Sequence, residues 1–255
     1  MGAPGLTHSS QRYKLNLNMA VASRLLKIPE LESEPGLLHG FSTLLIGNVG
    51  LSHAPDPDPV LASRRDFART LGTDAEALTV VGAVHGAAVA RVDEPRGVVQ
   101  GVDALVTDQR DVPLFATYAD CYPIVLWDPQ RRCVALAHAG WRGTAARVGP
   151  AAVRKMADEY GSDPASIHAG IGPGICGGCY EVGEEVASHF DPRFVKPGRD
   201  DRFVLDLAAA NRAQLNEAGV KEVHVLGLCT KETSFLPSHR REPDGTRFGA
   251  IVALR

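Results

Sequence analysis

The chain lacks the features that would place it in a membrane or on a nucleic acid. No stretch approaches the roughly 20 apolar residues needed to cross a bilayer. Residues 1–18 lack the charged and then apolar pattern of a signal peptide. The formal net charge is only −3, which offers no basic surface to nucleic acid or to an anionic membrane. We therefore expect a soluble, cytoplasmic protein, and the sequence leaves its oligomeric state open.

Cysteine is scarce, with five residues among 255, and the count is odd. A chain of this size buries about 75% of its unfolded surface, so it does not need disulfides to be stable. We therefore expect free thiols, some of which can serve as metal ligands.

Repeats, linkers and shifts of composition are also missing, so one domain is the simplest organisation. The first 35 residues are irregular and end in Glu34-Pro35-Gly36. We interpret residues 1–35 as an N-terminal arm or edge element and residues 36–255 as the domain itself.

Apolar runs in the middle third have the composition and spacing of short strands. They predict strands at residues 78–81, 87–92, 104–107, 114–118, 124–127 and 133–137. Helical spacing predicts helices at residues 60–71, 144–160, 180–190 and 205–218. Further strands are expected at residues 39–43, 167–172, 223–226 and 249–254. Helices and strands mix without a regular βαβ alternation, which indicates an α+β fold.

Three apolar strands are expected to end at a residue that can bind a metal. These residues are His85, Cys121 and His138, and strand ends present side chains to pockets on a rigid scaffold. Two imidazoles and one thiolate suit zinc, and three protein ligands leave a fourth position open, as in catalytic zinc sites. However, a lone histidine or buried cysteine is more often structural, and this spacing is too wide for a local zinc motif. The residues alone suggest a metal site without establishing it.

Longer motifs surround these residues in a fixed order. They are Ala-Asp-Cys-x-Pro at 119–123, His-Ala-Gly-Trp-Arg-Gly at 138–143, Ile-Gly-Pro-x-Ile at 171–175, Tyr-Glu-Val-Gly at 180–183, Cys-Thr at 229–230, Ser-His-Arg-Arg at 238–241 and Asp-Gly at 244–245. Together they resemble the laccase-domain family, also called multicopper polyphenol oxidoreductase or purine nucleoside phosphorylase. The resemblance runs from about His39 to the C-terminus.

The resemblance implies a layered α/β/β/α arrangement with mixed β-sheets, and residues 36–255 would form a catalytic domain of this type. It assigns metal binding and catalysis to His85, Cys121 and His138, with zinc as the cofactor and copper as the alternative. The implied activity is phosphorolysis of purine nucleosides such as adenosine, inosine and methylthioadenosine, with adenosine deamination as a companion. The implied partners are therefore a small-molecule nucleoside and phosphate.

Three other functions stay open at this point. The same metal ligands suit a copper-dependent polyphenol oxidase, although the His-x-His pairs of full multicopper oxidases are missing. Cys121 could also be the nucleophile of a cysteine hydrolase, with His85 or His138 as its base. Finally, the domain could bind a ligand without turning it over.

Several polar residues are candidates for substrate binding. Arg142 could clamp phosphate or pack on Trp141, and Arg240 and Arg241 form a basic cluster with His239. Asp120 could orient a ligand or water, and Asn48 could bind substrate, although both residue types also form turns. The resulting set of substrate-binding residues is Asn48, Asp120, Arg142, Arg240 and Arg241.

Two departures from the family pattern bear on substrate recognition. Residues 44–46 are Leu-Leu-Ile where the family has an arginine after Phe-Ser-Thr, and the loop that follows is shortened. Ala83 replaces a family glutamine. The pair Cys176 and Cys179 lacks a second Cys-x-x-Cys pair. The resemblance implies that it belongs to a glycine-rich turn lining the site, with a redox or anion-binding role as the alternative.

Overall fold

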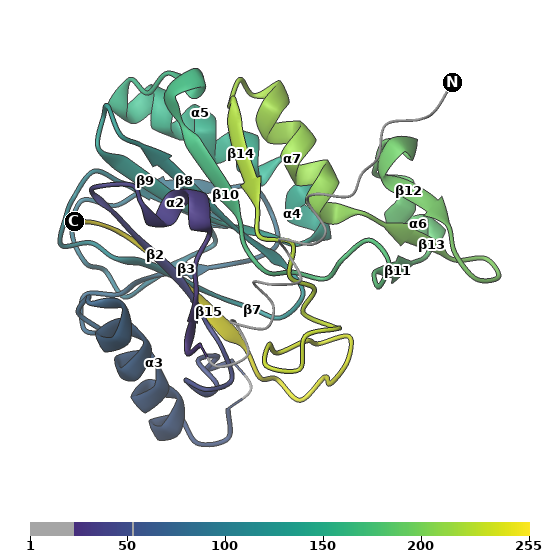
Figure 1. Cartoon of the computed structure of the whole chain (residues 1–255), viewed down its shortest axis with the longest axis horizontal. Coiled ribbons are helices and arrows are strands. Elements are labelled where there is room, and N and C mark those ends of the chain that lie inside the picture. The colour runs from purple at the N-terminus through teal and green to yellow at the C-terminus, as the bar shows by residue number, and fades with distance from the viewer. Residues whose placement is uncertain (1–22, 53) are drawn as a thin grey trace, which may run out of the picture.

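Two six-stranded sheets stacked face to face form the centre of the computed structural model, which describes residues 23–52 and 54–255 (Figure 1). The first sheet has the order β1 (Leu25–Leu26), β2 (Leu37–Ser42), β15 (Phe248–Leu254), β7 (Leu114–Tyr118), β3 (Thr79–Gly82) and β5 (Val98–Gln100). The second has the order β14 (Glu222–Val225), β10 (His168–Ile171), β8 (Tyr122–Asp128), β9 (Cys133–Ala139), β6 (Ala104–Thr107) and β4 (Val89–Arg91). Each sheet contains both parallel and antiparallel pairs.

The central strands of the second sheet are buried on both faces. Every residue of β8 and β9 is buried, which explains why these strands are nearly continuous apolar runs. Along β8, Val125 and Trp127 join the core between the sheets, whereas Ile124 and Leu126 join the core under the helices. This alternation is the period of two that a strand imposes on its side chains.

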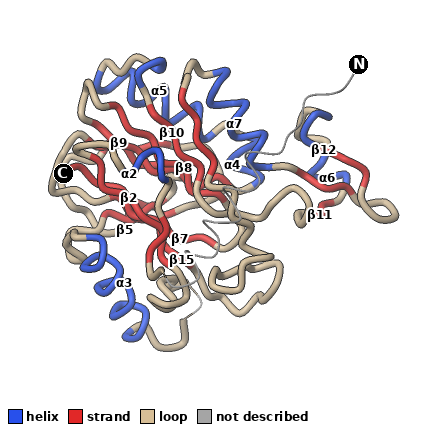
Figure 2. The backbone as a smooth tube through the Cα atoms, in the orientation of Figure 1, coloured by secondary structure: helices blue, strands red, loops and turns tan. Residues whose placement is uncertain are grey.

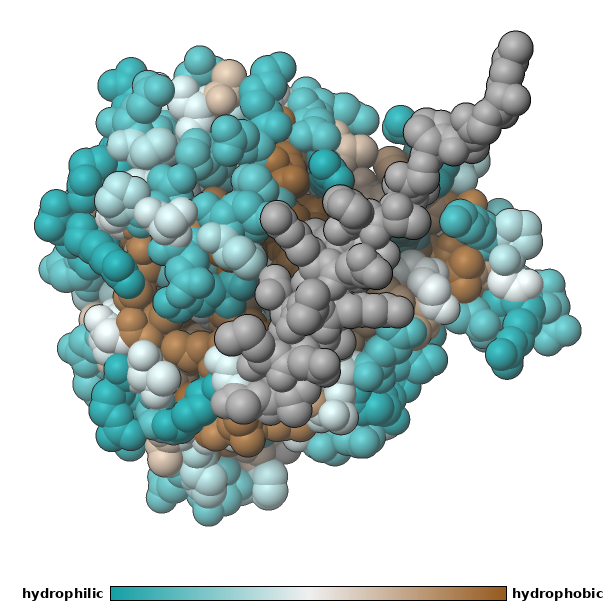
Figure 3. Space-filling model, in the orientation of Figure 1, coloured by the Kyte–Doolittle hydropathy of each residue, from teal (hydrophilic) through white to brown (hydrophobic). Residues whose placement is uncertain are grey.

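Helices cover the outer face of each sheet. On the first sheet, α3 (Asp58–Leu71) packs Phe67 and Leu71 into a cluster with Phe115 of β7. On the second, α5 (Val148–Tyr160) and α7 (Leu207–Glu217) pack against the strands, and hydrophilic side chains prevail on the exposed sides of α3 and α5 (Figure 3). The layers therefore run α/β/β/α, and the predicted single α+β domain with mixed sheets is confirmed.

The ends of two helices follow directly from the sequence. The chain leaves α3 at Gly72, where φ is 90°, a conformation that glycine adopts without the steric cost of a Cβ. At the start of α7, the Asp206 carboxylate accepts a hydrogen bond from the Ala209 N–H, which satisfies one of the free donors of the first turn.

The predicted helix over residues 144–160 is wrong as a single element. The structure divides it into α4 (Trp141–Ala145) and α5, because Arg147 between them has φ of 63° and cannot continue a right-handed helix. The short helix α4 begins two residues after the end of β9, the strand that carries His138.

The predicted helix over residues 180–190 is also wrong over most of its length. Only α6 (Glu184–Ala187) is helical, and β11 (Glu181–Val182) pairs instead with β13 (Phe203–Leu205). Together with β12 (Val195–Pro197) these strands form a three-stranded sheet that projects beside α7 (Figure 1). Pairing with a distant strand overrides the local helical pattern here.

The segment before β2 is built into the first sheet. Residues 1–22 of the predicted arm lie outside the described residues. In the remainder, β1 pairs with β2 at the sheet edge, and α2 (Pro29–Glu32) buries Leu31 completely. Within the described residues, no helix combines the length and apolar character needed to cross a bilayer. The boundary between arm and domain stays a prediction.

Candidate metal centre and active-site cavity

His85, Cys121 and His138 meet at one end of the two sheets. His85 lies in the turn after β3, Cys121 lies between β7 and β8, and His138 lies within β9. One ligand atom from each of the three lies within 4.8 Å of the others. The two imidazole rings are perpendicular, at an angle of 89°, with their centroids 5.3 Å apart. Three separate segments thus bring their metal-binding atoms to a common point.

The buried side chain of Asp103 shapes the turn that carries His85. Its two carboxylate oxygens accept hydrogen bonds from the N–H groups of Val84, at 3.1 Å, and Gly86, at 2.8 Å. The backbone carbonyl of Asp103 accepts a further bond from the His138 N–H at 2.7 Å. One aspartate therefore fixes the backbone around both histidines, and it stabilises His85 at a left-handed φ of 63°.

Gly140 leaves the space in which the cysteine and the first histidine approach each other. A Cβ atom at this position would lie 2.8 Å from the Cys121 sulfur and 3.3 Å from Cδ2 of His85. Both distances are shorter than ordinary van der Waals contacts. Any larger residue here would displace two of the three candidate ligands.

His138 has a buried nitrogen without a hydrogen-bond partner. Its ring stacks on Tyr118 with centroids 4.7 Å apart, and its Nε2 atom is buried and unpaired among the described residues. Burial, with a smaller effect from His85, lowers the pKa of His138 to about 3, so its imidazole is neutral near pH 7. A neutral imidazole with an unused lone pair is the form that binds a metal.

The Cys121 thiol also fits a metal ion. Burial, together with the neighbouring Asp120 carboxylate, raises its pKa to about 12. The thiol therefore keeps its proton at neutral pH unless a cation stabilises the thiolate, and a bound metal does this because only the thiolate coordinates. The donor set of two imidazoles and one thiolate suits zinc or copper, so the residues present fit the metal that the sequence predicts.

A cavity of about 650 Å³ opens over these three residues. Its volume lies in the range of sites for small molecules. Besides His85, Cys121 and His138, its wall includes the polar or charged side chains Arg64, Gln100, His239 and Arg247. The cavity thus combines a candidate metal centre with two arginines.

Sequence reasoning missed both of these arginines. Arg64 lies on α3, where its Nε donates to the Val49 carbonyl at 2.8 Å and its guanidinium lies 4.8 Å from the Phe115 ring centroid. Arg247 directly precedes β15, and its N–H donates to Oδ1 of Asn48 at 2.9 Å. The Asp-Gly motif at 244–245 was the only sequence signal close to Arg247, and Arg64 resembled an ordinary surface residue.

None of the five residues predicted to bind substrate is among the described residues that line the cavity. Asn48 forms a turn, with Oδ1 accepting from the Gly50 N–H at 2.9 Å, and it holds the backbone of Arg247. The Arg142 guanidinium lies 4.3 Å from the Trp141 ring centroid. Arg142 therefore packs on Trp141, which is the alternative to a phosphate contact for this residue.

Of the other three residues, Asp120 and Arg240 connect the Cys121 turn to the loop over residues 226–247, which Figure 2 shows beside β7 and β15, and Arg241 makes its contacts within that loop. The Asp120 carboxylate accepts from the Thr230 hydroxyl at 2.6 Å and from the Arg240 N–H at 2.7 Å. The Arg241 guanidinium donates to the carbonyls of Thr230, at 2.7 Å, and Leu236, at 2.6 Å. These contacts hold the loop in shape next to Cys121.

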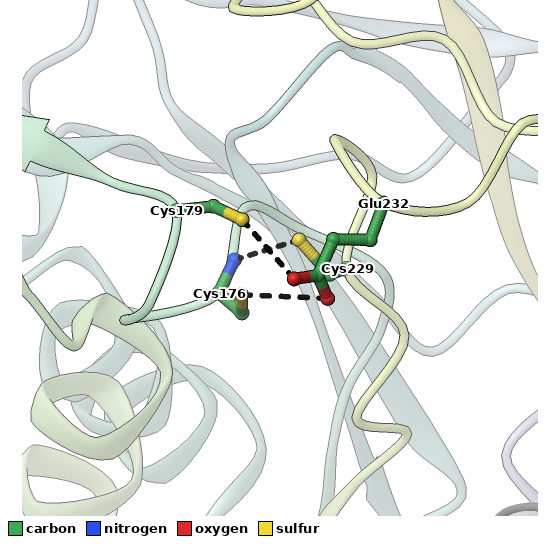
Figure 4. Close-up of side chains that lie close together, drawn as sticks. All are labelled: Cys176, Cys179, Cys229 and Glu232. Atoms are coloured by element: carbon green, nitrogen blue, oxygen red, sulfur yellow. Dashed lines mark hydrogen bonds between the residues drawn. The ribbon is translucent and has the colours of Figure 1, made fainter.

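A second group of candidate metal ligands is present. The expectation that the turn at Cys176 and Cys179 lines the site is wrong, because neither residue is among the described residues that line the cavity. Together with Cys229 and Glu232 they place one potential ligand atom each within 4.8 Å of the others (Figure 4). All five cysteines of the chain are free thiols, as predicted.

Comparison with known proteins identifies the family. The family model described as multi-copper polyphenol oxidoreductase laccase matches residues 39–255, and the chain belongs to this family. The resemblance that the sequence motifs indicate is therefore confirmed.

Individual relatives cover most of the chain. A protein of Deinococcus radiodurans named purine nucleoside phosphorylase is 40% identical over 242 residues, covering 90% of this chain and 92% of the relative. A protein named adenosine deaminase RL5, from an unknown prokaryotic organism, is 37% identical over 201 residues, covering 71% and 76%. The crystal structure of the hypothetical protein YfiH of Bacillus licheniformis has a TM-score of 0.86 at 28% identity, covering 92% of this chain and 98% of that one.

Proposed function

We propose that this protein is a purine nucleoside phosphorylase with a zinc ion at His85, Cys121 and His138. The observation that carries the proposal is the convergence of these three ligands in a cavity that also contains Arg64 and Arg247. The relative named purine nucleoside phosphorylase, which covers nearly the whole chain, supports the same activity. We expect adenosine, inosine and methylthioadenosine as substrates.

A different feature of the structure prepares each of the three ligands to bind the metal. His138 offers the lone pair of its buried Nε2, Asp103 fixes the turn of His85, and Gly140 leaves room for the Cys121 sulfur. A zinc ion bound here would supply Lewis-acid polarisation of the reacting group.

Arg64 and Arg247 are the residues that we propose for binding phosphate. Phosphate recognition needs cationic hydrogen-bond donors, and guanidinium groups match its geometry. Residues 44–46 provide no arginine at the position where the family has one, and these two cavity-lining arginines supply positive charge in its place. Asn48, Asp120, Arg240 and Arg241 would then act by positioning the cavity wall, and Arg142 by packing on Trp141.

Adenosine deamination is the second candidate activity, because one relative is named adenosine deaminase. One assay separates the two reactions. Purified zinc-loaded protein is incubated with adenosine and phosphate, and the products are analysed for adenine with ribose 1-phosphate or for inosine. Phosphorolysis gives the first pair and requires phosphate, whereas deamination gives inosine without it.

Variants connect either activity to the metal ligands. Cys121→Ser should abolish most of the turnover, whereas Cys133→Ala, which removes a buried thiol outside the cavity, should not. Turnover that survives Cys121→Ser undiminished would refute the role of this site. Metal analysis distinguishes zinc from copper, and oxygen uptake with a phenol tests the oxidase alternative. Zinc bound through the Cys121 sulfur would exclude that thiolate as a hydrolase nucleophile.

A further inference from the structure

Three cysteines and one glutamate form a cluster that the proposed activity does not use (Figure 4). Cys176 and Cys179 lie in the loop between β10 and β11, whereas Cys229 and Glu232 lie in the loop between β14 and β15. The Cys179 sulfur is 3.4 Å from one Glu232 carboxylate oxygen, and the Cys176 sulfur is 3.9 Å from the other. Two ligands on a tetrahedral zinc ion with Zn–S bonds of ~2.3 Å are about 3.8 Å apart. Small side-chain rotations would therefore complete a tetrahedral site.

Backbone hydrogen bonds hold the two loops together at this cluster. Gly174 and Cys229 form an isolated parallel β-bridge, in which the Thr230 N–H donates to the Gly174 carbonyl at 3.0 Å. The Cys176 N–H donates to the Cys229 sulfur at 3.3 Å. The Cys179 N–H donates to the Cys176 carbonyl at 2.9 Å and closes a tight turn between these two ligands. The arrangement is therefore set by the backbone as well as by side-chain rotamers.

The chemistry of the four groups favours zinc. One sulfur or carboxylate oxygen from each of the four residues lies within 4.8 Å of the others. Such crowding of groups that become anionic is relieved by a divalent cation, which then keeps the thiolates deprotonated. Three thiolates with one carboxylate suit zinc, and four protein ligands leave no open position, as in structural zinc sites. A disulfide between Cys176 and Cys179 would leave Cys229 and Glu232 without a role.

We propose that Cys176, Cys179, Cys229 and Glu232 bind a second, structural zinc ion. This ion joins the two loops that contact Asp120, the neighbour of Cys121. The Ile175 N–H donates to the Asp120 carbonyl at 2.9 Å from one loop, and the Thr230 hydroxyl donates to its carboxylate at 2.6 Å from the other. The second zinc thus fixes the wall of the cavity without contacting substrate.

The first experiment is metal analysis of the purified full-length protein and its variants. Wild type and Cys133→Ala should contain two zinc ions per chain. Cys176→Ser/Cys179→Ser, which changes only half-buried side chains, should contain one. His85→Ala/Cys121→Ser should also contain one, held by the second cluster, and this result does not depend on any enzymatic activity. Two zinc ions in Cys176→Ser/Cys179→Ser would overturn the proposal, as would iron in place of zinc.

Zinc-edge X-ray absorption of the wild type gives a test that needs no variant. One sulfur at the first site and three at the second average to two sulfurs per zinc. If the first site alone binds zinc, the average is one, and mass spectrometry would then show whether Cys176 and Cys179 form a disulfide. A single zinc with one sulfur would overturn the second site while leaving the phosphorylase proposal intact. Conversely, two zinc ions in a protein without phosphorolysis would support both metal sites and refute the proposed activity.

Discussion

Replacing Asp103 by asparagine tests whether the turn of His85 is held in place for metal binding. The carboxylate accepts hydrogen bonds from the N–H groups of Val84 and Gly86. An asparagine keeps one acceptor oxygen and places an amide donor opposite the other N–H. The lost bond involves a charged group and is worth roughly 1.5–3 kcal/mol. Each kcal/mol corresponds to about 2–4 °C in melting temperature for a chain of this size.

The effect on the metal should be larger than the effect on the fold. Residues that orient metal ligands typically contribute about 10–100-fold to metal affinity, and we expect Asp103→Asn to weaken zinc binding at His85, Cys121 and His138 by this factor. Competition with a chelator measures the affinity, and phosphorolysis should fall at limiting zinc and recover in part at excess zinc.

A matched control separates an effect on the turn of His85 from an effect on the general stability of the protein. Asp163→Asn removes another carboxylate that accepts a backbone hydrogen bond, from the Ala165 N–H at 3.0 Å, at the start of the 3-10 helix η1 (Pro164–Ser166). This control should keep wild-type zinc affinity. If Asp103→Asn lowers the melting temperature yet binds zinc as tightly as the control, Asp103 does not position His85, and the reasoning fails.

Three further predictions address the cavity and the fold. Gly140→Ala places a methyl carbon 2.8 Å from the Cys121 sulfur, so zinc affinity should fall at least about tenfold, because the sulfur must move. Arg247→Ala should raise the KM for phosphate about tenfold or more, as expected for one charged hydrogen bond, with a smaller change for adenosine; equal changes for both would contradict a phosphate site. Burial, with a smaller effect from Lys27, lowers the pKa of His39 from 6.5 to about 4, so the unfolded chain takes up its proton first as the pH falls. Urea unfolding should show about 3 kcal/mol of stability lost between pH 6.5 and 4, and His39→Gln should lack this part of the loss.

The strands that the sequence predicts are all present, whereas two of its four predicted helices are wrong in part. The strands at 104–107 and 114–118 coincide with β6 and β7, because a buried strand between two layers must be a continuous apolar run. The predicted helix at 144–160 fails at Arg147, since nothing in a periodic pattern reports a left-handed backbone angle. The predicted helix at 180–190 fails because β11 pairs with β13, a partner some 20 residues further along the chain.

The residues of the candidate site are harder to predict from the sequence than the helices and strands. His85, Cys121 and His138 could be grouped only through the family motifs, because their spacing along the chain carries no local signal. Asp103 and Arg64 could not be found at all. Asp103 acts on the turn of His85, and Arg64 lines the cavity. The turn and the cavity exist only after the sheets have assembled.

Asp120 shows why the two clusters of candidate metal ligands and their surrounding loops should be treated as one system. Its φ of 82° lies in the left-handed region, where a non-glycine residue persists only if its surroundings hold it there. Those surroundings are the Thr230 hydroxyl, the Arg240 N–H and the Ile175 N–H. All three donors lie in the two loops that the second cluster joins, whereas the next residue, Cys121, belongs to the first cluster. A displacement of either loop therefore moves the backbone that positions the Cys121 sulfur. The second zinc ion joins the two loops, so it holds Cys121 in place without contacting the substrate.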